Sequence, residues 1–364
     1  MTKFLIIVAG VVVSLLVILG AVWFWLKGRQ TRSAPHGSTG VPPFRIELTP
    51  KPTPTWQQEA EVDTFSHVIE TSGFQRIGDF AIPQMHDLMV RGFCDRKRAA
   101  FAIIYEHPQV GLVLDLVRIH KGCTATVTSA PDDGLDHPGN TARTQIPFEN
   151  LDEDGASATW AKMLPALDEL CKDKTPIPAL PKTFVAAFTS SYAAEMDWRI
   201  RRGGVTEDEV RRVALAGGQE DPAPDAIEQV KAVWRSTIDK FVGSEVIGQF
   251  LAAREISAVD WEQMRDRILV VHEYSETDAL CDSLAALTDT PAPADDAEVS
   301  EPNEAASGLR AELGAAFTDA QVIDGFAAAL ELLPSTHRFE KIGSVQRPWR
   351  AEVYLKPSPA ELAA

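Results

Sequence analysis

Cysteine is scarce in this chain. Four cysteines occur among 364 residues, at positions 94, 123, 171 and 281, and no two form a CxxC pair. Dense disulfide frameworks belong mainly to small secreted domains, and zinc sites commonly use closely spaced cysteine pairs. The wide spacing therefore predicts free thiols that are buried or half-buried, and it agrees with a reducing compartment.

Recognisable catalytic and nucleotide-binding motifs are also missing. The sequence contains no GxxxxGK[ST], GxGxxG, HExxH or GxSxG pattern, and its eight histidines are scattered. His272-Glu273 lacks the second histidine one helical turn further on. We therefore predict no cofactor and no metal. An active site assembled from distant residues stays open as an alternative.

An excess of positive charge is absent. The chain has 35 basic and 52 acidic residues, so its formal net charge is −17. A net-acidic protein repels the phosphate backbone of nucleic acids. We therefore expect no nucleic-acid partner.

The clearest positive feature is an uncharged run of 23 residues, Phe4–Leu26. At about 1.5 Å per residue a helix of this length spans roughly 35 Å, slightly more than the ~30 Å hydrocarbon core of a bilayer. The run predicts a transmembrane helix over residues 4–26, with the lipid bilayer as its partner. The alternative is a cleaved signal peptide, but such peptides have apolar cores of about 7–15 residues and then small residues. Here Lys27, Arg29 and Arg32 follow.

The charges that flank this run predict its orientation. Lys3 lies on one side, and Lys27, Arg29 and Arg32 lie on the other. Because positive charge accumulates on the cytoplasmic side of a membrane, we expect an external N-terminus and a cytoplasmic body. The predicted location is the cell membrane, with a single pass.

A proline-rich stalk is expected over residues 27–56, followed by an α+β domain over 57–175. A helix is predicted for Gln57–Ser72, and a second flanks the sheet at Ala156–Cys171. β-Branched and aromatic segments separated by turn signals predict strands Phe74–Ile82, Leu88–Phe93, Ala99–Tyr105, Gly111–His120 and Cys123–Ser129. Their short connections favour an antiparallel meander. Gly111–His120 is largely apolar on both faces, so we expect it to be central and covered on each side.

The rest of the chain divides into a helical region at 176–288, an acidic disordered linker at 289–307 and a small C-terminal helix-plus-strand element at 308–364. Thr206 and Glu209 fit a capping box. Ser257 fits an N-cap of a helix carrying Trp261, Met264, Ile268 and Val271. Trp349–Leu355 alternates as a strand does. Phe339–Gly343 resembles Phe74–Gly78, which indicates either chance or a degenerate duplication.

A partner-binding site is a possibility at the end of one predicted helix. Trp198, Arg199, Arg201 and Arg202 lie together there, and an aromatic ring among arginines can attract an acidic partner. The simpler alternative is a solvated helix end with pairs Glu195–Arg199 and Asp197–Arg201 at the i,i+4 spacing. That alternative is favoured.

Two further segments carry suggestive chemistry. The loop with Asp132, Asp133, Asp136, His137 and Asn140 is rich in oxygen ligands for a hard cation, but its spacing does not match an EF-hand. Cys94 precedes Arg96, Lys97 and Arg98, whose charges can activate a thiol. A solvated loop and a charged turn explain these segments more simply.

The sequence as a whole predicts an α+β protein with one N-terminal transmembrane helix, an antiparallel β-meander with flanking helices, a following helical region and a small C-terminal α/β tail. The leading functional hypothesis is a membrane-anchored, non-catalytic binding or scaffolding module for a protein partner. The alternative is a membrane-anchored hydrolase-type enzyme with a dispersed site.

Overall fold

The computed structural model describes residues 41–364 except 87, 108–110, 149, 171, 217–218, 255, 288–313, 315, 318–320 and 363–364. The predicted transmembrane helix at 4–26, the first part of the stalk and the acidic linker at 289–307 lie outside the described residues. In the part of the chain that is described, no helix is long and apolar enough to cross a membrane. The chain divides into two compact units between Val233 and Trp234.

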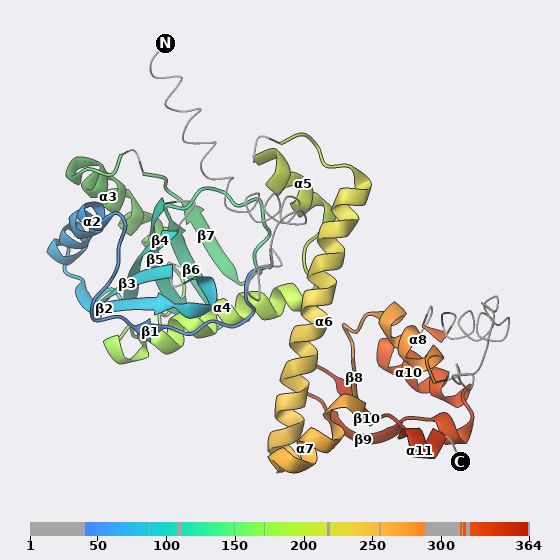
Figure 1. Ribbon diagram of the computed structural model, residues 1–364. Helices are drawn as coiled ribbons and strands as arrows, with labels where there is room; N and C mark the ends of the chain where they lie inside the picture. The colour runs from blue at the N-terminus through green and yellow to red at the C-terminus, as the bar shows by residue number, and fades with distance from the viewer. Residues whose placement is uncertain are drawn as a thin grey trace. The chain divides into compact units, whose positions relative to one another are not determined.

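The first unit is a mixed α+β structure built on a seven-stranded sheet (Figure 1). The strands follow one another in chain order: β1 Thr49–Pro50, β2 Gln75–Ile82, β3 Leu88–Asp95, β4 Ala100–His107, β5 Gly111–His120, β6 Cys123–Thr128 and β7 Thr141–Gln145. All neighbours from β1 to β6 are antiparallel. For β2 to β6 this arrangement was expected from their short connections. Only β7, which follows a longer loop, pairs in parallel with its neighbour β6.

Helices cover both faces of this sheet (Figure 1). Helices α2 Glu59–Thr71 and α3 Glu153–Leu170 pack on one face, and α4 Phe184–Arg201 packs on the other. The unit also contains α5 Glu207–Ala216 and 3-10 turns at Pro83–Met85 and Pro181–Thr183. Helix α6, Pro224–Arg254, begins in this unit. Helix α3 continues through Pro165, although an interior proline normally kinks or breaks a helix.

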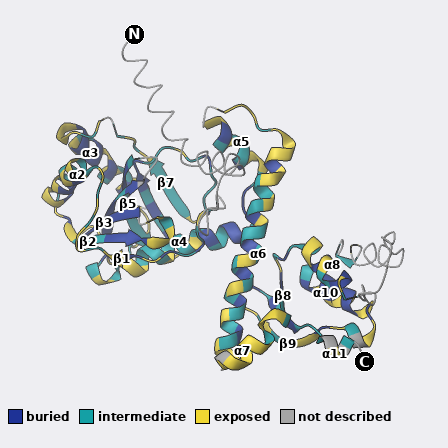
Figure 2. Cartoon of the chain, in the orientation of Figure 1, coloured by how far each residue is buried: buried dark blue, intermediate teal, exposed yellow. Residues whose placement is uncertain are grey.

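Strand β5 shows how the sequence pattern positions these layers. Successive side chains of a strand point to opposite faces. Leu114 and Leu116 are fully buried in the core that includes residues of α2 and α3. The other face of the sheet packs against α4, where Phe184 contacts Phe80 and Phe101. The predicted double-sided cover of a central strand is confirmed, and Figure 2 shows the buried strands between exposed helix surfaces.

The second half of the predicted stalk packs against the body. Phe44, Ile46 and Leu48 are buried, and β1 pairs with β2. Pro50 lies in this outermost strand, where a missing N–H donor discourages further strand pairing. Residues 41–48 are irregular and pack apolar side chains against the body, and only Thr49–Pro50 belongs to the sheet.

The second unit contains a three-stranded antiparallel sheet in the order β8-β10-β9. Its strands are β8 Ile268–His272, β9 Glu340–Val345 and β10 Ala351–Leu355. Its helices are the remainder of α6, α7 Ala258–Met264, α8 Thr277–Ala285, α10 Val322–Glu331 and α11 Pro359–Leu362, with 3-10 turns at Arg265–Arg267 and Ser335–His337. Leu284, Phe326 and Tyr354 lie in the core of this unit.

One predicted helix is shorter than expected. Ser257 caps α7 as predicted, because its Oγ accepts a hydrogen bond from the Asp260 N–H at 3.1 Å. The helix ends at Met264, however, and Ile268–His272 is a strand. The prediction that Ile268 and Val271 continue the helix is wrong. This β-branched run pairs with β10, a partner far downstream that local periodicity cannot reveal.

The two similar segments noted in the sequence occupy equivalent places. Phe74–Gly78 leads into β2 after helix α2, and Phe339–Gly343 leads into β9 after helix α10. The register shifts at Ile77 in one strand and at Ile342 in the other, so each isoleucine forms a β-bulge. The two segments thus share a bulge at the same position, and a degenerate duplication stays a prediction.

Candidate functional site

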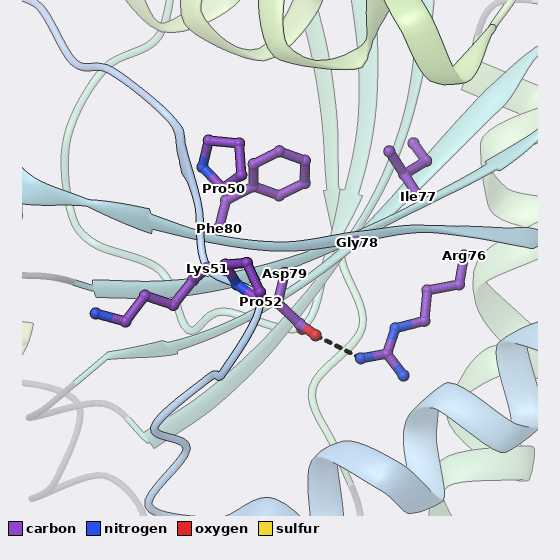
Figure 3. A pocket seen from close by; sticks show the side chains of 8 residues that line it. All are labelled: Pro50, Lys51, Pro52, Arg76, Ile77, Gly78, Asp79 and Phe80. Carbon is purple, nitrogen blue, oxygen red and sulfur yellow. Dashed lines mark hydrogen bonds and ion pairs between the residues drawn. The ribbon is translucent and has the colours of Figure 1, made fainter.

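A shallow pocket of about 440 Å³ lies between β1 and β2 (Figure 3). Its lining contains the charged side chains of Lys51, Arg76 and Asp79. Asp79 pairs with Arg76 and also accepts a 2.7 Å bond from Arg91 Nε, while Lys51 extends away from both (Figure 3). Because its carboxylate is already neutralised and its cations diverge, this pocket lacks the convergent polar groups of a binding site.

A more concentrated set of ionisable groups lies on the α4 side of the same sheet. It contains Tyr105 of β4, Asp115 of β5, Arg143 of β7, Glu195 of α4 and His137 of the loop before β7. We call these five residues the polar cluster. Asp115 alternates with Leu114 and Leu116, so it points away from the apolar core beneath α2 and α3.

Asp115 is the innermost carboxyl of the polar cluster. The Tyr105 hydroxyl donates to Asp115 Oδ2 at 3.0 Å. Burial raises the pKa of Asp115, although a bond from Thr128 and the charge of Arg143 oppose the shift. Asp115 Oδ1 and Arg143 Nε are both buried without a hydrogen-bond partner among the described residues. Burial and the Asp115 charge also raise the pKa of Tyr105 well above its usual value.

His137 joins the loop to both α4 and β7. Its Nδ1 lies 3.0 Å from Glu195 Oε1, and its Nε2 lies 2.7 Å from Arg143 Nη1. A guanidinium can only donate, so Nε2 must accept, and the ring proton must sit on Nδ1 and point to Glu195. The ring is therefore neutral in this arrangement. With both nitrogens engaged, it does not present a free base to a substrate.

Glu195 is ionised within this arrangement. Burial acts to raise the pKa of Glu195, but the hydrogen bond from His137 and the charges of Arg143 and Arg199 hold that pKa below its usual value. The pKa shifts of the two carboxyls are therefore opposite: burial raises that of Asp115, whereas a hydrogen bond and nearby positive charges lower that of Glu195. Such divergence is common at functional sites and also in structural ion-pair networks.

The predicted partner-binding residues have distinct environments. Arg199 is 1% exposed, pairs with Glu209 at 3.0 Å and donates to the Asp136 carbonyl. Arg202 pairs with the Asp136 carboxylate at 3.0 Å, and its guanidinium lies 4.5 Å from the Trp198 ring centre. Arg201 is exposed. The structure therefore places two of the four residues in an ion-pair network, and partner binding by the group stays a prediction.

The predicted helical pairs of this segment have other partners in the fold. Glu195 contacts His137, and Asp197 pairs with Arg45 at 2.6 Å. These partners are distant in sequence, so the i,i+4 spacing alone did not identify them.

The predicted capping box is confirmed. The Thr206 N–H donates to Glu209 Oε2 at 2.7 Å, and the Glu209 N–H donates to Thr206 Oγ1 at 3.2 Å. Glu209 is fully buried and also accepts from the Asp136 N–H. Burial would raise its pKa, but these hydrogen bonds and Arg199 lower it. Glu209 therefore joins α5, α4 and the loop.

The acidic loop uses its oxygens internally. Asp132 and Asp133 each accept a backbone N–H within the loop at 3.0 Å, and Asp136 pairs with Arg202 and Arg212. Over the described ranges, no group of three or more His, Cys, Asp or Glu side chains is placed to hold a metal ion. These contacts favour the structural interpretation of the loop.

Cys94 is shielded instead of activated. Its side chain is buried, and burial raises the pKa of its thiol despite the nearby charge of Arg96. Asp95 organises the turn by accepting the N–H groups of Lys97 and Arg98. The basic run therefore fits a charged turn between β3 and β4.

Sequence reasoning missed the polar cluster as a unit. Asp115 carried a signal, since it is the one acidic residue of β5 and lies between two leucines. Arg143 and Glu195 carried none, because only the sheet register and the packing of α4 bring them to His137.

No protein-family model matches the chain. Searches among curated proteins and among solved structures likewise found no similar protein.

Proposed function

We propose that this protein is a single-pass membrane-anchored module with a cytoplasmic body, which binds or scaffolds a protein partner without catalysing a reaction. The apolar run Phe4–Leu26 and its basic flank support the anchor and the orientation. The folded body would project from the membrane as a recognition domain.

The observation that carries the non-catalytic part of the proposal is the pairing of His137. Its two ring nitrogens are held by Glu195 and Arg143 at 3.0 and 2.7 Å. A general base needs a nitrogen within reach of a substrate proton. In this geometry His137 connects its loop to helix α4 through Glu195 and to strand β7 through Arg143.

Capture of a partner from membranes tests the proposal. A photo-crosslinking amino acid replaces Arg201, the exposed arginine of the predicted partner-binding group, in the full chain with its anchor. The matched control replaces Lys121, which is exposed in the β5–β6 turn. We expect a discrete, reproducible adduct from position 201 and not from position 121. Recovery of no partner from either position, or by affinity purification of the anchored protein, would refute the scaffolding role.

A second candidate function, a membrane-anchored hydrolase, rests on Asp115. A buried carboxyl with a raised pKa beside a tyrosine and an arginine is a composition found in active sites. Turnover of model carboxylic-ester, phosphoester and peptide substrates by the full chain tests this candidate. If hydrolysis appears and is lost in both Asp115→Asn and Tyr105→Phe, the enzyme hypothesis replaces the scaffold hypothesis.

A further inference from the structure

The hydrogen bonds of His137 depend on its protonation state. Arg143 donates to Nε2 only while that nitrogen is unprotonated. A proton added to Nε2 would place two donors 2.7 Å apart and two positive charges in contact. The present bond cannot survive that change.

A replacement partner already lies next to the ring. Asp133 Oδ1 is 3.8 Å from His137 Nε2, just beyond hydrogen-bond distance, and its other oxygen is 3.9 Å from Arg143 Nη1. Glu195 stays on the opposite side at Nδ1 and would stabilise the charged ring. The ring therefore has two possible partners for the same nitrogen, one for each protonation state.

We propose that His137 is a proton-operated switch. When a proton adds to Nε2, the Arg143 N–H loses its acceptor and Nε2–H donates to Asp133 instead. The loop carrying His137 and Asp133 then changes its attachment to β7 while keeping its attachment to α4 through Glu195. The released Arg143 lies in the field of Asp115, so the change at the loop reaches the central strand of the sheet.

Each element packed against His137 contributes a charged group that favours or opposes protonation of the ring. Helix α4 supplies Glu195, with Arg199 acting on that carboxylate, and the loop supplies Asp133. Both carboxylates favour the charged ring.

Strand β7 supplies Arg143, which opposes the charged ring. Behind it lie Asp115 of β5 and Tyr105 of β4, which bind each other. Tyr192 of α4 lies in the field of Glu195, but its hydroxyl donates to the Pro43 carbonyl. Because opposing charges meet here, single substitutions should move the transition in opposite directions.

Amide hydrogen exchange of the full chain in lipid nanodiscs tests the switch. The reporters are the N–H groups of Gly134, Leu135 and Asp136, which are bonded to Asp132, Asp133 and Glu209. After correction for intrinsic chemistry, we expect a change in protection of at least about threefold with a midpoint between pH 5 and 8, the range where histidine titrates.

Four variants separate the switch from a general pH effect. His137→Gln keeps a donor and an acceptor but cannot titrate, so the pH-dependent change in amide protection should disappear. Arg143→Gln keeps a donor for Nε2 but removes the positive charge, so the midpoint of the protection change should move to higher pH. Asp133→Asn removes the charge that receives the protonated ring, so its midpoint should fall. His67→Gln, at an exposed site on α2, should match the parent.

Contrary results are equally specific. The proposal is overturned if amide protection in the parent chain does not change between pH 5 and 8. It is also overturned if His137→Gln shows the same change as the parent. If His137→Gln does not fold, as judged by circular dichroism, the opposite shifts of Arg143→Gln and Asp133→Asn decide the question. Equal midpoints in those two variants would reject the switch.

Discussion

Asp115 places a buried carboxyl on strand β5 of the sheet. Its backbone belongs to the central strand β5, while its carboxyl is buried beside Tyr105 and within the field of Arg143. Burial disfavours the charged form more than these contacts favour it, so the pKa rises. The ionised Asp115 carboxylate therefore lowers the free energy of unfolding. This cost disappears as the pH falls through the raised pKa.

Replacing Asp115 with Asn is therefore expected to increase the free energy of unfolding at pH 8 by an amount on the order of 1 kcal/mol. Asn keeps an oxygen that accepts from Tyr105 but carries no charge. The difference from the parent should shrink as the pH falls, because Asp115 is then neutral in both folded and unfolded chains. Urea unfolding at several pH values measures this, with exposed Asp173→Asn as the control. A variant less stable than the parent at pH 8 would contradict the assignment.

At the scale of elements, the contact between α4 and the sheet depends on a missing side chain. A Cβ placed on Gly92 of β3 would lie 2.5 Å from Cζ of Phe184, the first residue of α4. Phe184 is 1% exposed and contacts Phe80 and Phe101, so its ring has little room to move. Gly92 is required here by close approach and not by its backbone angles.

Gly92→Ala should lower the free energy of unfolding by about 1–3 kcal/mol, the usual cost of overpacking a core. Gly139→Ala is the matched control, since nothing lies within 4 Å of its added Cβ. A second variant, Gly92→Ala with Phe184→Leu, should recover part of the loss. Chemical denaturation measures all three, and a Gly92→Ala protein as stable as the parent would show that α4 packs differently.

Glu209 connects two helices and a loop through one carboxylate. Its partners include the buried Arg199 and the N–H groups of Thr206 and Asp136. Removing one charge of a buried pair leaves the other uncompensated, which typically costs about 3–5 kcal/mol. Glu209→Gln should therefore destabilise the protein by roughly this amount at neutral pH.

Acid should reproduce part of this loss in the parent. The pKa of Glu209 lies below its ordinary value of 4.5, so its contribution is present above pH 4.5 and is lost as the pH falls through the folded-state pKa. The control is Glu207→Gln, which alters only a surface pair with Arg211 and should leave the unfolding curve unchanged. Equal denaturation midpoints for the two variants would contradict the proposed connection.

At the scale of the whole molecule, the transmembrane helix over residues 4–26 stays a prediction that deletion can test. Deleting residues 4–26 should move the protein from the membrane fraction to the soluble fraction, since the run contains the longest uncharged apolar stretch of the chain. Carbonate extraction followed by immunoblotting measures this. A matched deletion within 289–307 should leave the protein in membranes. Retention of the 4–26 deletion in the membrane fraction would show that another segment provides the attachment.

Local patterns in the sequence determined the elements that local physics controls. Alternation and turn signals predicted β2 to β6 and their antiparallel order, because short connections leave few other pairings. The capping box at Thr206 and the N-cap at Ser257 were predicted because each involves residues three apart. The apolar run at 4–26 predicts a membrane span for the same reason: its length and lack of charge are local properties.

Only the tertiary structure decided which distant residues meet. Strand β8 was predicted as helix because its partner β10 lies far along the chain. His137 appeared in the sequence as one oxygen-rich loop residue among several, and the packing of α4 and β7 brought Glu195 and Arg143 to its two ring nitrogens. Hydrophobic periodicity records which side of an element is buried, but it carries no information on which charged group lies opposite. The polar cluster therefore belongs to the fold, whereas the predicted anchor can be read from the sequence alone.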